Sequence, residues 1–237
     1  MASFFVSYAD GEEYQQRQQL QAAAVRELDC FDEVLTFGPE DLSPSFKNKN
    51  RKLLRYEKGA GLWIWKPQIL LQVFRDYAQP GDVVFYCDVD HMFVRAPAEF
   101  LELGLSQDIL LFHEHGDTAD KCTYPATFSY MNLSPDDYRD TPMILGGYHV
   151  WRVGVAAVSF VREWLQWCCD ERVILPGSLD VRCVGSLKLV DENTDTNLKC
   201  HCFDQSVLTL LAQKRGVVPE ESPKYRKYLV ETTMSDS

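Results

Sequence analysis

The stretch GDVVFYCDVDHMFV, residues 81–94, decides the fold, because a run of apolar and aromatic residues leads directly into two aspartates separated by one valine. Such a continuous run predicts a strand at 83–87 that is covered on both faces, as in a parallel sheet. In open α/β sheets, ligands bind at the carboxyl ends of the strands. Asp88 and Asp90 occupy that end. Side chains at i and i+2 point to the same side of a strand, so both carboxylates are expected to face one crevice.

Strand and helix patterns alternate on both sides of this motif. Strand patterns are found in ASFFVSYAD (2–10), FDEVLTF (31–37), DILLFHEH (108–115) and MILGGYHVWRV (143–153). Helix patterns are found in GEEYQQRQQLQAAAVREL (11–28), PQILLQVFRDYA (67–78), GVAAVSFVREWLQWCCDERV (154–173) and FDQSVLTLLAQKRG (203–216). Pro67 suits a first helical position. The alternation predicts a mainly parallel sheet with helices on both faces, in one domain over residues 1–237 with a frayed tail at about 231–237.

The composition is that of a globular enzyme, with 46% hydrophobic and 25% charged residues. Asp plus Glu number 35 against 24 Lys plus Arg, and the formal net charge of -11 argues against a nucleic-acid partner. A small phosphorylated ligand is still compatible with this charge if a metal ion and a few cations are local to it. No apolar run approaches the length of a membrane span, so none is expected.

The chain has eight cysteines without a CxxC pair, which gives little support to a structural zinc site. They are Cys30, Cys87, Cys122, Cys168, Cys169, Cys183, Cys200 and Cys202. The first residues lack the basic region of a signal peptide. Free thiols and no export signal predict a cytoplasmic protein.

Two carboxylates held close together repel each other unless a positive charge lies between them. Mn²⁺ and Mg²⁺ prefer carboxylate oxygens and usually bridge to substrate phosphates. We therefore predict a divalent metal site at Asp88 and Asp90, although a D-x-D pair by itself also fits two solvated aspartates in a turn.

A hydrophobic strand that ends in D-x-D resembles the signature of nucleotide-sugar-dependent glycosyltransferases with the GT-A fold. The resemblance extends over roughly residues 3–215, through FFVSYAD, RKLLRYEKGAGLWIWKP, GDVVFYCDVD, MILGGYHVWR and HCFDQSVLTLL in this order. These segments are similar to a family of small glycosyltransferases that includes the N-terminal domain of the chlorovirus rhamnosyltransferase that builds capsid glycans. The resemblance implies a single Rossmann-like GT-A domain. The implied activity is metal-dependent transfer of a hexose or pentose from a UDP-sugar to a glycan or another hydroxyl acceptor.

The resemblance also implies which residues hold the donor nucleotide. Ser7, Tyr8 and Ala9 match the end of the strand that holds the base and ribose. Lys66 matches a cation that faces the diphosphate, and Arg55 and Arg51 are weaker candidates for the same contact. Asp88 is expected to bind both the donor and the Mn²⁺ or Mg²⁺ ion, and Asp90 the ion.

At the sugar end, Gly147 matches a glycine at which the backbone approaches the donor sugar. Asp204 and Gln205 match a pair that borders this sugar. His201 matches the first histidine of the family pattern H-x-H-D-Q, whereas the second histidine is replaced by Phe203. Bond cleavage places negative charge on the leaving phosphate and positive charge on the sugar. Asp204 would either stabilise this cation or act as base toward the acceptor.

Two other classes of function fit parts of the same pattern. Phosphatases of the haloacid-dehalogenase type also place D-x-D after a buried strand, but on an early strand and with Thr or Val two positions later. Here HM follows Asp90, and two strand patterns precede the motif. A non-catalytic sugar-nucleotide-binding module requires no change of fold, and it would bind the donor without turnover.

Overall fold

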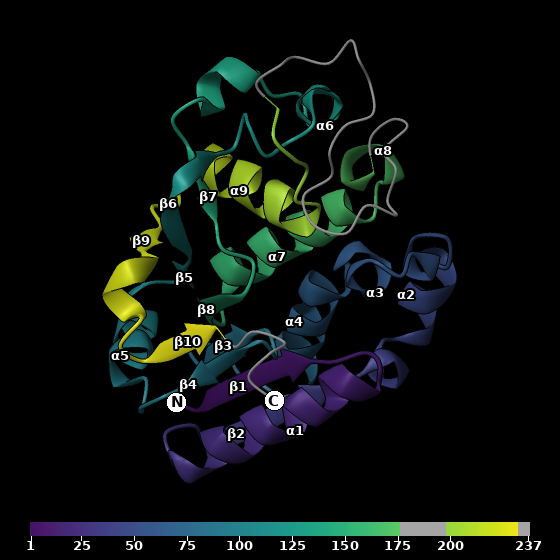
Figure 1. The fold of residues 1–237 in the computed structure, drawn as a ribbon. Helices are drawn as coiled ribbons and strands as arrows, with labels where there is room; N and C mark the ends of the chain where they lie inside the picture. Colours follow the sequence, from purple (N-terminus) through teal and green to yellow (C-terminus); the bar gives the residue numbers. More distant parts are fainter. Residues whose placement is uncertain (176–197, 232–237) are drawn as a thin grey trace.

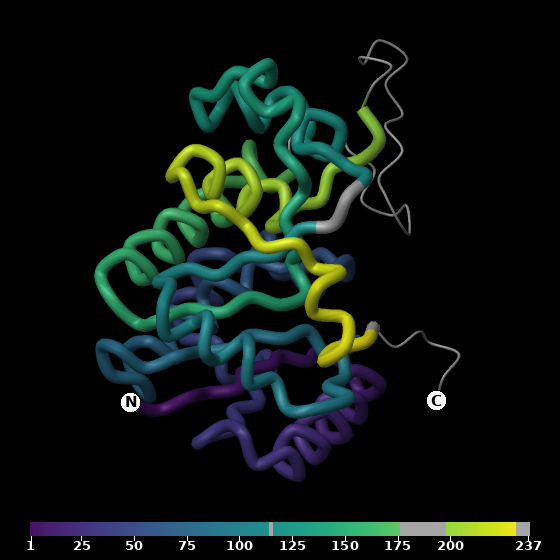
Figure 2. The backbone as a smooth tube through the Cα atoms, turned by 90° about the vertical axis from the view of Figure 1, so that its left-hand side faces the viewer, coloured from purple at the N-terminus to yellow at the C-terminus, as the bar shows by residue number. Residues whose placement is uncertain are grey.

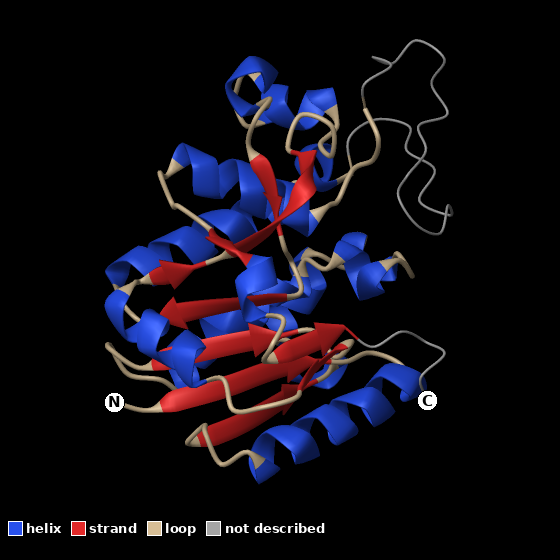
Figure 3. Cartoon of the chain, turned by 60° about the vertical axis from the view of Figure 1, so that its left-hand side comes forward, coloured by secondary structure: helices blue, strands red, loops and turns tan. Residues whose placement is uncertain are grey.

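A central five-stranded sheet lies between two layers of helices in a computed structural model that describes residues 1–175 and 198–231 (Figures 1 and 3). The strand order is β2 (Glu33–Phe37), β1 (Ser3–Tyr8), β3 (Val83–Cys87), β8 (Tyr148–Arg152) and β5 (Ile109–Leu110). β1 pairs in parallel with β2 and β3, whereas β8 is antiparallel to both β3 and β5. All strands of this sheet except β8 therefore run in one direction, which confirms the mainly parallel α/β fold.

Both faces of the sheet are buried, as the apolar run at 83–87 predicted. Alternate residues of β1 enter separate cores, with Phe4, Val6 and Tyr8 in one and Phe5 in the other. The first core is shared with helices α4 (Trp65–Asp76), α7 (Val155–Cys168) and α9 (Asp204–Lys214). The second is shared with α1 (Glu12–Glu27) and α5 (Ala98–Ser106). This alternation follows from the twofold repeat of side chains along a strand.

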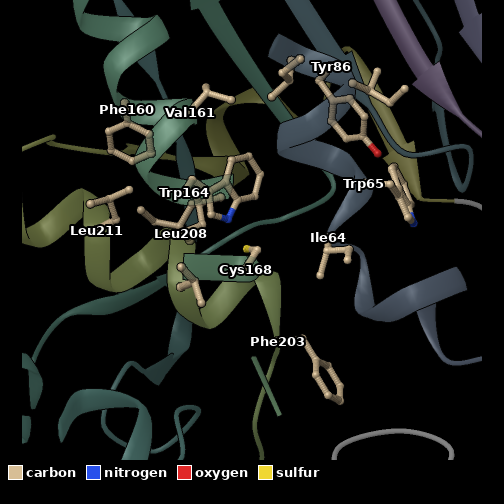
Figure 4. Close-up of a cluster of buried hydrophobic side chains, with 14 of the residues drawn as sticks. Ile64, Trp65, Tyr86, Phe160, Val161, Trp164, Cys168, Phe203, Leu208 and Leu211 are labelled. Atoms are coloured by element: carbon tan, nitrogen blue, oxygen red, sulfur yellow. The ribbon is translucent and has the colours of Figure 1, made fainter. Parts of the chain in front are cut away.

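The larger core joins three helices that are distant in sequence. Trp164 and Phe160 of α7 pack between the sheet and Leu208 and Leu211 of α9, and Ile64 lies at the start of α4 nearby (Figure 4). α7 contacts both α4 and α9. The packing of α9 on α7 fixes the position of the first turn of α9, where Asp204 and Gln205 are found.

Two small sheets and several short helices complete the described chain. One sheet has the order β7 (Pro142–Ile144), β6 (Phe112–Thr118) and β9 (Glu220–Glu221), and the other pairs β4 (His91–Phe93) with β10 (Leu229–Glu231). The short helices are α2 (Pro44–Lys49), α3 (Gly59–Leu62), α6 (Pro125–Tyr130) and α8 (Glu171–Ile174). Short 3₁₀ turns cover Pro39–Asp41, Leu53–Arg55, Pro135–Tyr138 and Ser222–Tyr225.

Three predicted elements differ from the structure. The strand expected at 108–115 is divided into β5 and β6, and the strand expected at 143–153 is divided into β7 and β8, with each part in a different sheet. A helix expected over 154–173 ends at Cys168 and is followed by α8. An apolar pattern indicates burial, but not which partner strand or helix buries it, and this choice depends on distant segments.

Pro67 is the third residue of α4 rather than the first, because the helix begins at Trp65. This position is still compatible with proline, since the N–H groups of a first turn have no partner within the helix. Cys183 and the expected frayed tail beyond residue 231 lie outside the described residues. No helix in the described part of the chain is long and apolar enough to cross a membrane.

Candidate functional site

Asp88 and Asp90 lie in a tight turn after β3 and not in an extended strand. The backbone N–H of His91 donates to the carbonyl of Asp88 over 3.2 Å, and β4 starts at His91. Gln21 of α1 holds this turn, because its Nε2 donates to the carbonyls of Asp88 and His91, each over 2.7 Å. The expectation that the two carboxylates share one side of a strand is therefore wrong.

Lys66 connects the D-x-D turn with the start of α9. Its Nζ donates to Oδ2 of Asp88 over 2.7 Å and to the carbonyl of Gly146 over 2.9 Å, and lies 4.0 Å from Oδ2 of Asp204. The hydroxyl of Tyr86 donates to the other carboxylate oxygen of Asp88. Burial by itself would lower the pKa of Lys66, but Asp88 and Asp204 outweigh burial and hold this pKa above its usual value. The ammonium group is thus charged at neutral pH.

Asp204, the first residue of α9, is a buried carboxyl group whose proton affinity is unusual. Only 3% of the residue is exposed, and no hydrogen-bond partner for its Oδ2 is found among the described residues. Burial raises the pKa of Asp204 to about 7, with Lys66 opposing this shift and Asp88 adding to it. A carboxyl group that exchanges its proton near neutral pH suits proton transfer or stabilisation of a cation.

Asp90 has a different environment from Asp88. Its side chain is 44% exposed and accepts a hydrogen bond from Nδ1 of His91 over 2.6 Å. Burial raises the pKa of Asp90, but the contact with His91 outweighs it, so the pKa lies below the usual value. Asp90 is therefore ionised at neutral pH and partly exposed, whereas Asp88 is held between Lys66 and Tyr86.

Two cavities meet at these aspartates. The aromatic cavity, of about 230 Å³, is bordered by Tyr8, Ala9, Tyr14, Trp63 and Trp65 together with Asp10, Glu57 and the D-x-D turn. The polar cavity, of about 310 Å³, is bordered by Lys58, Lys66, Gly146, Gly147, His201, Cys202, Phe203, Asp204 and Gln205. Trp63, Asp88 and Asp90 line both. The two carboxylates therefore reach the same space, although the turn and not strand geometry brings them there.

A left-handed turn forms one wall of the aromatic cavity. All five residues of GAGLW, 59–63, have positive φ, with values of 59°, 47°, 98°, 58° and 59°. Ala60, Leu62 and Trp63 are L-residues with a side chain, for which this region costs about 1–2 kcal/mol each. The turn presents Trp63 to both cavities, while Trp65 stacks on Tyr8 with ring centroids 3.9 Å apart. Backbone strain of this kind concentrates at ligand sites.

The structure brings together most of the residues that the sequence assigned to the donor. Tyr8 and Ala9 line the aromatic cavity, whereas Ser7 is fully buried in β1 and outside its lining. Lys66, Gly147, Asp204 and Gln205 line the polar cavity. Arg51 and Arg55 are exposed and belong to the lining of neither cavity.

His201 and Gly147, which both line the polar cavity, also contact or approach other protein groups. Nδ1 of His201 accepts from the backbone N–H of Tyr124 over 3.3 Å, and Nε2 lies 3.2 Å from the carbonyl of Ile174. Burial lowers the pKa of His201 to about 4, so the ring is neutral and both nitrogens are engaged. At Gly147, an added Cβ would lie 2.6 Å from the ring of His91. This glycine therefore leaves space for the residue that contacts Asp90.

The oxygen ligands and the net charge of the site fit a divalent cation. When Asp88, Asp90 and Asp204 are all ionised, Lys66 cancels one of their three charges, and two negative charges are left. The carboxylates of Asp88 and Asp90, at the junction of the cavities, are hard oxygen ligands of the kind that Mn²⁺ and Mg²⁺ prefer. These two residues would hold the ion.

Sequence reasoning missed two residues that position the D-x-D turn. Gln21 is fully buried beneath it, and Tyr86 contacts Asp88 from within β3. The signal for Gln21 was its spacing from Gln18, Ala22 and Val25, which marks a buried helix face that contains amides. A buried amide is expected to hold another polar group.

No family model and no curated protein matches the chain. Among solved structures, it is similar to the apo form of mouse xyloside xylosyltransferase 1, with a TM-score of 0.49 and 9% sequence identity. The match covers 92% of this chain and 84% of that chain. The resemblance to the chlorovirus rhamnosyltransferase is not shown by these comparisons and stays a prediction.

Proposed function

We propose that this chain is a metal-dependent glycosyltransferase of the GT-A type, which moves a sugar from a UDP-sugar to a glycan or another hydroxyl acceptor. The observation that carries this proposal is the meeting of two different cavities at Asp88 and Asp90. A nucleotide sugar has a flat base at one end, a charged diphosphate in the middle and a polar sugar at the other end. The order of aromatic cavity, carboxylate turn and polar cavity matches these three parts.

The nucleoside would occupy the aromatic cavity. Tyr8, Tyr14, Trp63 and Trp65 border it, and aromatic rings offer stacking surfaces to a base. The carboxylate of Asp10, also in the lining, can accept hydrogen bonds from ribose hydroxyls.

Charge supports a metal requirement at the middle of the donor. The described lining of the aromatic cavity contains Asp10, Glu57, Asp88 and Asp90, and no lysine or arginine. Lys66, in the polar cavity, is already paired with Asp88. A diphosphate would be repelled here without a further cation. Mn²⁺ or Mg²⁺ held by Asp88 and Asp90 would neutralise the diphosphate and the charge that develops on the leaving group.

The sugar would lie in the polar cavity beside Asp204 and Gln205. Asp204 has the burial and the raised pKa of a reactive carboxyl group. It would either stabilise positive charge on the sugar or accept the proton of the acceptor hydroxyl. Lys66 keeps the Asp204 carboxylate close to the D-x-D turn, so that leaving group and reacting sugar are held on one scaffold.

The proposal is tested by release of UDP from UDP-glucose, UDP-galactose, UDP-xylose and UDP-rhamnose in the presence of Mn²⁺. We expect slow hydrolysis of at least one donor, lost on addition of a chelator and in Asp204→Asn, which should still bind UDP. Release of inorganic phosphate instead would favour a phosphatase. Donor binding without any turnover, with or without acceptors, would favour a binding module. Either result would contradict the proposal.

A further inference from the structure

Three cysteine side chains converge next to the polar cavity. The sulfur atoms of Cys122, Cys200 and Cys202 all lie within 4.8 Å of one another, and those of Cys200 and Cys202 are 3.5 Å apart. Cys122 and Cys200 are buried, whereas Cys202 is half-buried and lines the polar cavity. All three are free thiols. The cluster is therefore buried on one side and accessible to a small ion on the other.

The spacing of these sulfurs is that of a thiolate metal site. Tetrahedral zinc has Zn–S bonds of about 2.3 Å, which places two thiolates on the same ion about 3.8 Å apart. The observed separations need only small side-chain rotations to reach this value. Thiolates select Zn²⁺ and Cu⁺, while the carboxylates at Asp88 and Asp90 select Mn²⁺ and Mg²⁺. The three cysteines and the two aspartates would therefore bind different metals, although both groups border the polar cavity, the cysteines through Cys202.

We propose that Cys122, Cys200 and Cys202 bind one Zn²⁺ through three thiolates, with water as the fourth ligand, and that this ion fixes the loop that places Asp204. On binding, each thiol gives up its proton to the solvent, and three S–Zn bonds form without any change of oxidation state. A Cys200-x-Cys202 pair does not have the usual two-residue zinc spacing. The third thiol comes from a segment more than seventy residues away, so no zinc motif is visible in the residue spacing.

The position of Cys202 connects this site to Asp204. Its backbone carbonyl accepts from the N–H groups of Gln205 and Ser206, at the start of α9, over 3.0 and 3.4 Å. Its own N–H donates to Oγ of Ser206 over 2.9 Å, and this hydroxyl donates to the carbonyl of Cys122 over 2.6 Å. One serine thus links two of the proposed ligands to the first turn of the helix.

The backbone already brings the two segments together. The N–H of Lys199 donates to the carbonyl of Lys121 over 2.8 Å, and that of Cys202 donates to the carbonyl of Cys122 over 3.3 Å. Figure 2 shows the chain near residue 200 running beside the segment near residue 120. Between Cys202 and Asp204, Phe203 has a φ of 48° and a ψ of -118°, a strained conformation that its surroundings must maintain. An ion bound by Cys202 would help to maintain it.

Zinc binding is measured on the whole chain after removal of metal with a chelator under reducing conditions. Native mass spectrometry with added Zn²⁺ should show one ion per chain. Competition against a zinc-binding dye should show an affinity that falls at least about 100-fold in Cys122→Ser, Cys200→Ser and Cys202→Ser. Cys30→Ser removes a free thiol outside the cluster and should leave affinity and stoichiometry unchanged. Equal affinities in the parent and the three cluster variants would overturn the proposal.

The parent protein provides a test that does not depend on the folding of variants. Zn²⁺ should protect Cys122, Cys200 and Cys202 from alkylation, and should slow amide hydrogen exchange over residues 199–206, with no nucleotide present. Alkylation rates that Zn²⁺ does not change, or a Cys200–Cys202 disulfide in protein kept under reductant, would contradict the proposal. None of these measurements uses a sugar donor, so this inference and the proposed transferase activity can fail independently.

Discussion

Replacement of Asp204 by asparagine changes the pH dependence of stability in a direction set by burial. The side chain is 3% exposed, and its pKa is raised to about 7 from an ordinary value of 3.8, mainly by desolvation. Asparagine has nearly the same shape and does not ionise. The difference between variant and parent therefore isolates the cost of ionising a carboxyl group at this position.

The sign and the size of the effect follow from proton linkage. A carboxyl group whose pKa is higher in the folded state binds more protons folded than unfolded between the two pKa values. The folded state of the parent therefore loses stability as the pH rises from about 4 to about 7, while Asp204 ionises more easily in the unfolded chain than in the folded one. Below about pH 4 and above about pH 7, this carboxyl group adds no further pH dependence. The shift of about three pKa units corresponds to at most about 4 kcal/mol. The free energy of unfolding of Asp204→Asn, relative to that of the parent, should therefore increase by up to this amount between about pH 4 and about pH 8.

Urea unfolding of the parent and Asp204→Asn at several pH values measures this difference directly. Asp136→Asn is the matched control, since it makes the same change of carboxyl group to amide at a side chain that is 73% exposed. A flat curve for Asp204→Asn, or a curve that rises toward low pH, would show that Asp204 is not a carboxyl group held against its ionisation. Its assignment as the reactive carboxyl group would then lose its physical basis.

Three further substitutions test the scaffold around the cavities. Gly61→Ala places a Cβ 2.9 Å from Cα of Leu54 at a φ of 98°, so urea unfolding should show a loss of at least about 1–2 kcal/mol. In the control Gly154→Ala, the added Cβ lies in ordinary contact, 3.9 Å from the carbonyl oxygen of Arg152, on extended backbone, so this variant should be nearly neutral. Equal stabilities of the two variants would contradict this. Gln21→Leu removes two hydrogen bonds from the D-x-D turn and should lower the free energy of unfolding by about 1–3 kcal/mol. It should also weaken Mn²⁺-dependent UDP binding. An unchanged UDP affinity would mean that the turn does not need this amide. Lys66→Met leaves the carboxylates of Asp88 and Asp204 without their cation and should lower the free energy of unfolding by about 3–5 kcal/mol at neutral pH. The loss should be smaller near pH 4. Equal losses at both pH values would argue against a charge effect.

The features that sequence predicted are those encoded by local pattern. The apolar run at 83–87 correctly indicated a strand with both faces covered, because five consecutive apolar residues cannot leave one face in water. Alternation of strand and helix patterns correctly indicated the mainly parallel sheet. The reversed direction of β8 was not predictable, since Gly146 and Gly147 mark a break in the chain but not which sheet receives the strand after it.

The site itself was predictable in composition but not in its connections. Asp88, Asp90, Lys66, Asp204 and Gln205 were named from motif and resemblance, and all line the polar cavity. Lys66 contacts two of these carboxylates because of the way α4 packs against β3 and α9. This packing joins segments that are distant in sequence, so no local pattern predicts it.

Other parts of the site have no signature in residue type. Alanine, leucine and tryptophan normally avoid left-handed backbone, so nothing in GAGLW predicts five successive residues with positive φ. The cluster of three thiols likewise depends on the pairing of the segments near residues 121 and 200, which tertiary structure alone determines.

The central claim is that Asp88 and Asp90 form the metal and diphosphate junction between the two cavities. Isothermal titration of UDP into the parent protein, with Mn²⁺ and after its removal with a chelator, tests this claim most directly. We predict binding that requires Mn²⁺ and that is lost in Asp90→Ala without a change in the unfolding transition, because this side chain is 44% exposed in a turn. Binding of UDP that is equally strong without metal, or equally strong in Asp90→Ala, would contradict the account.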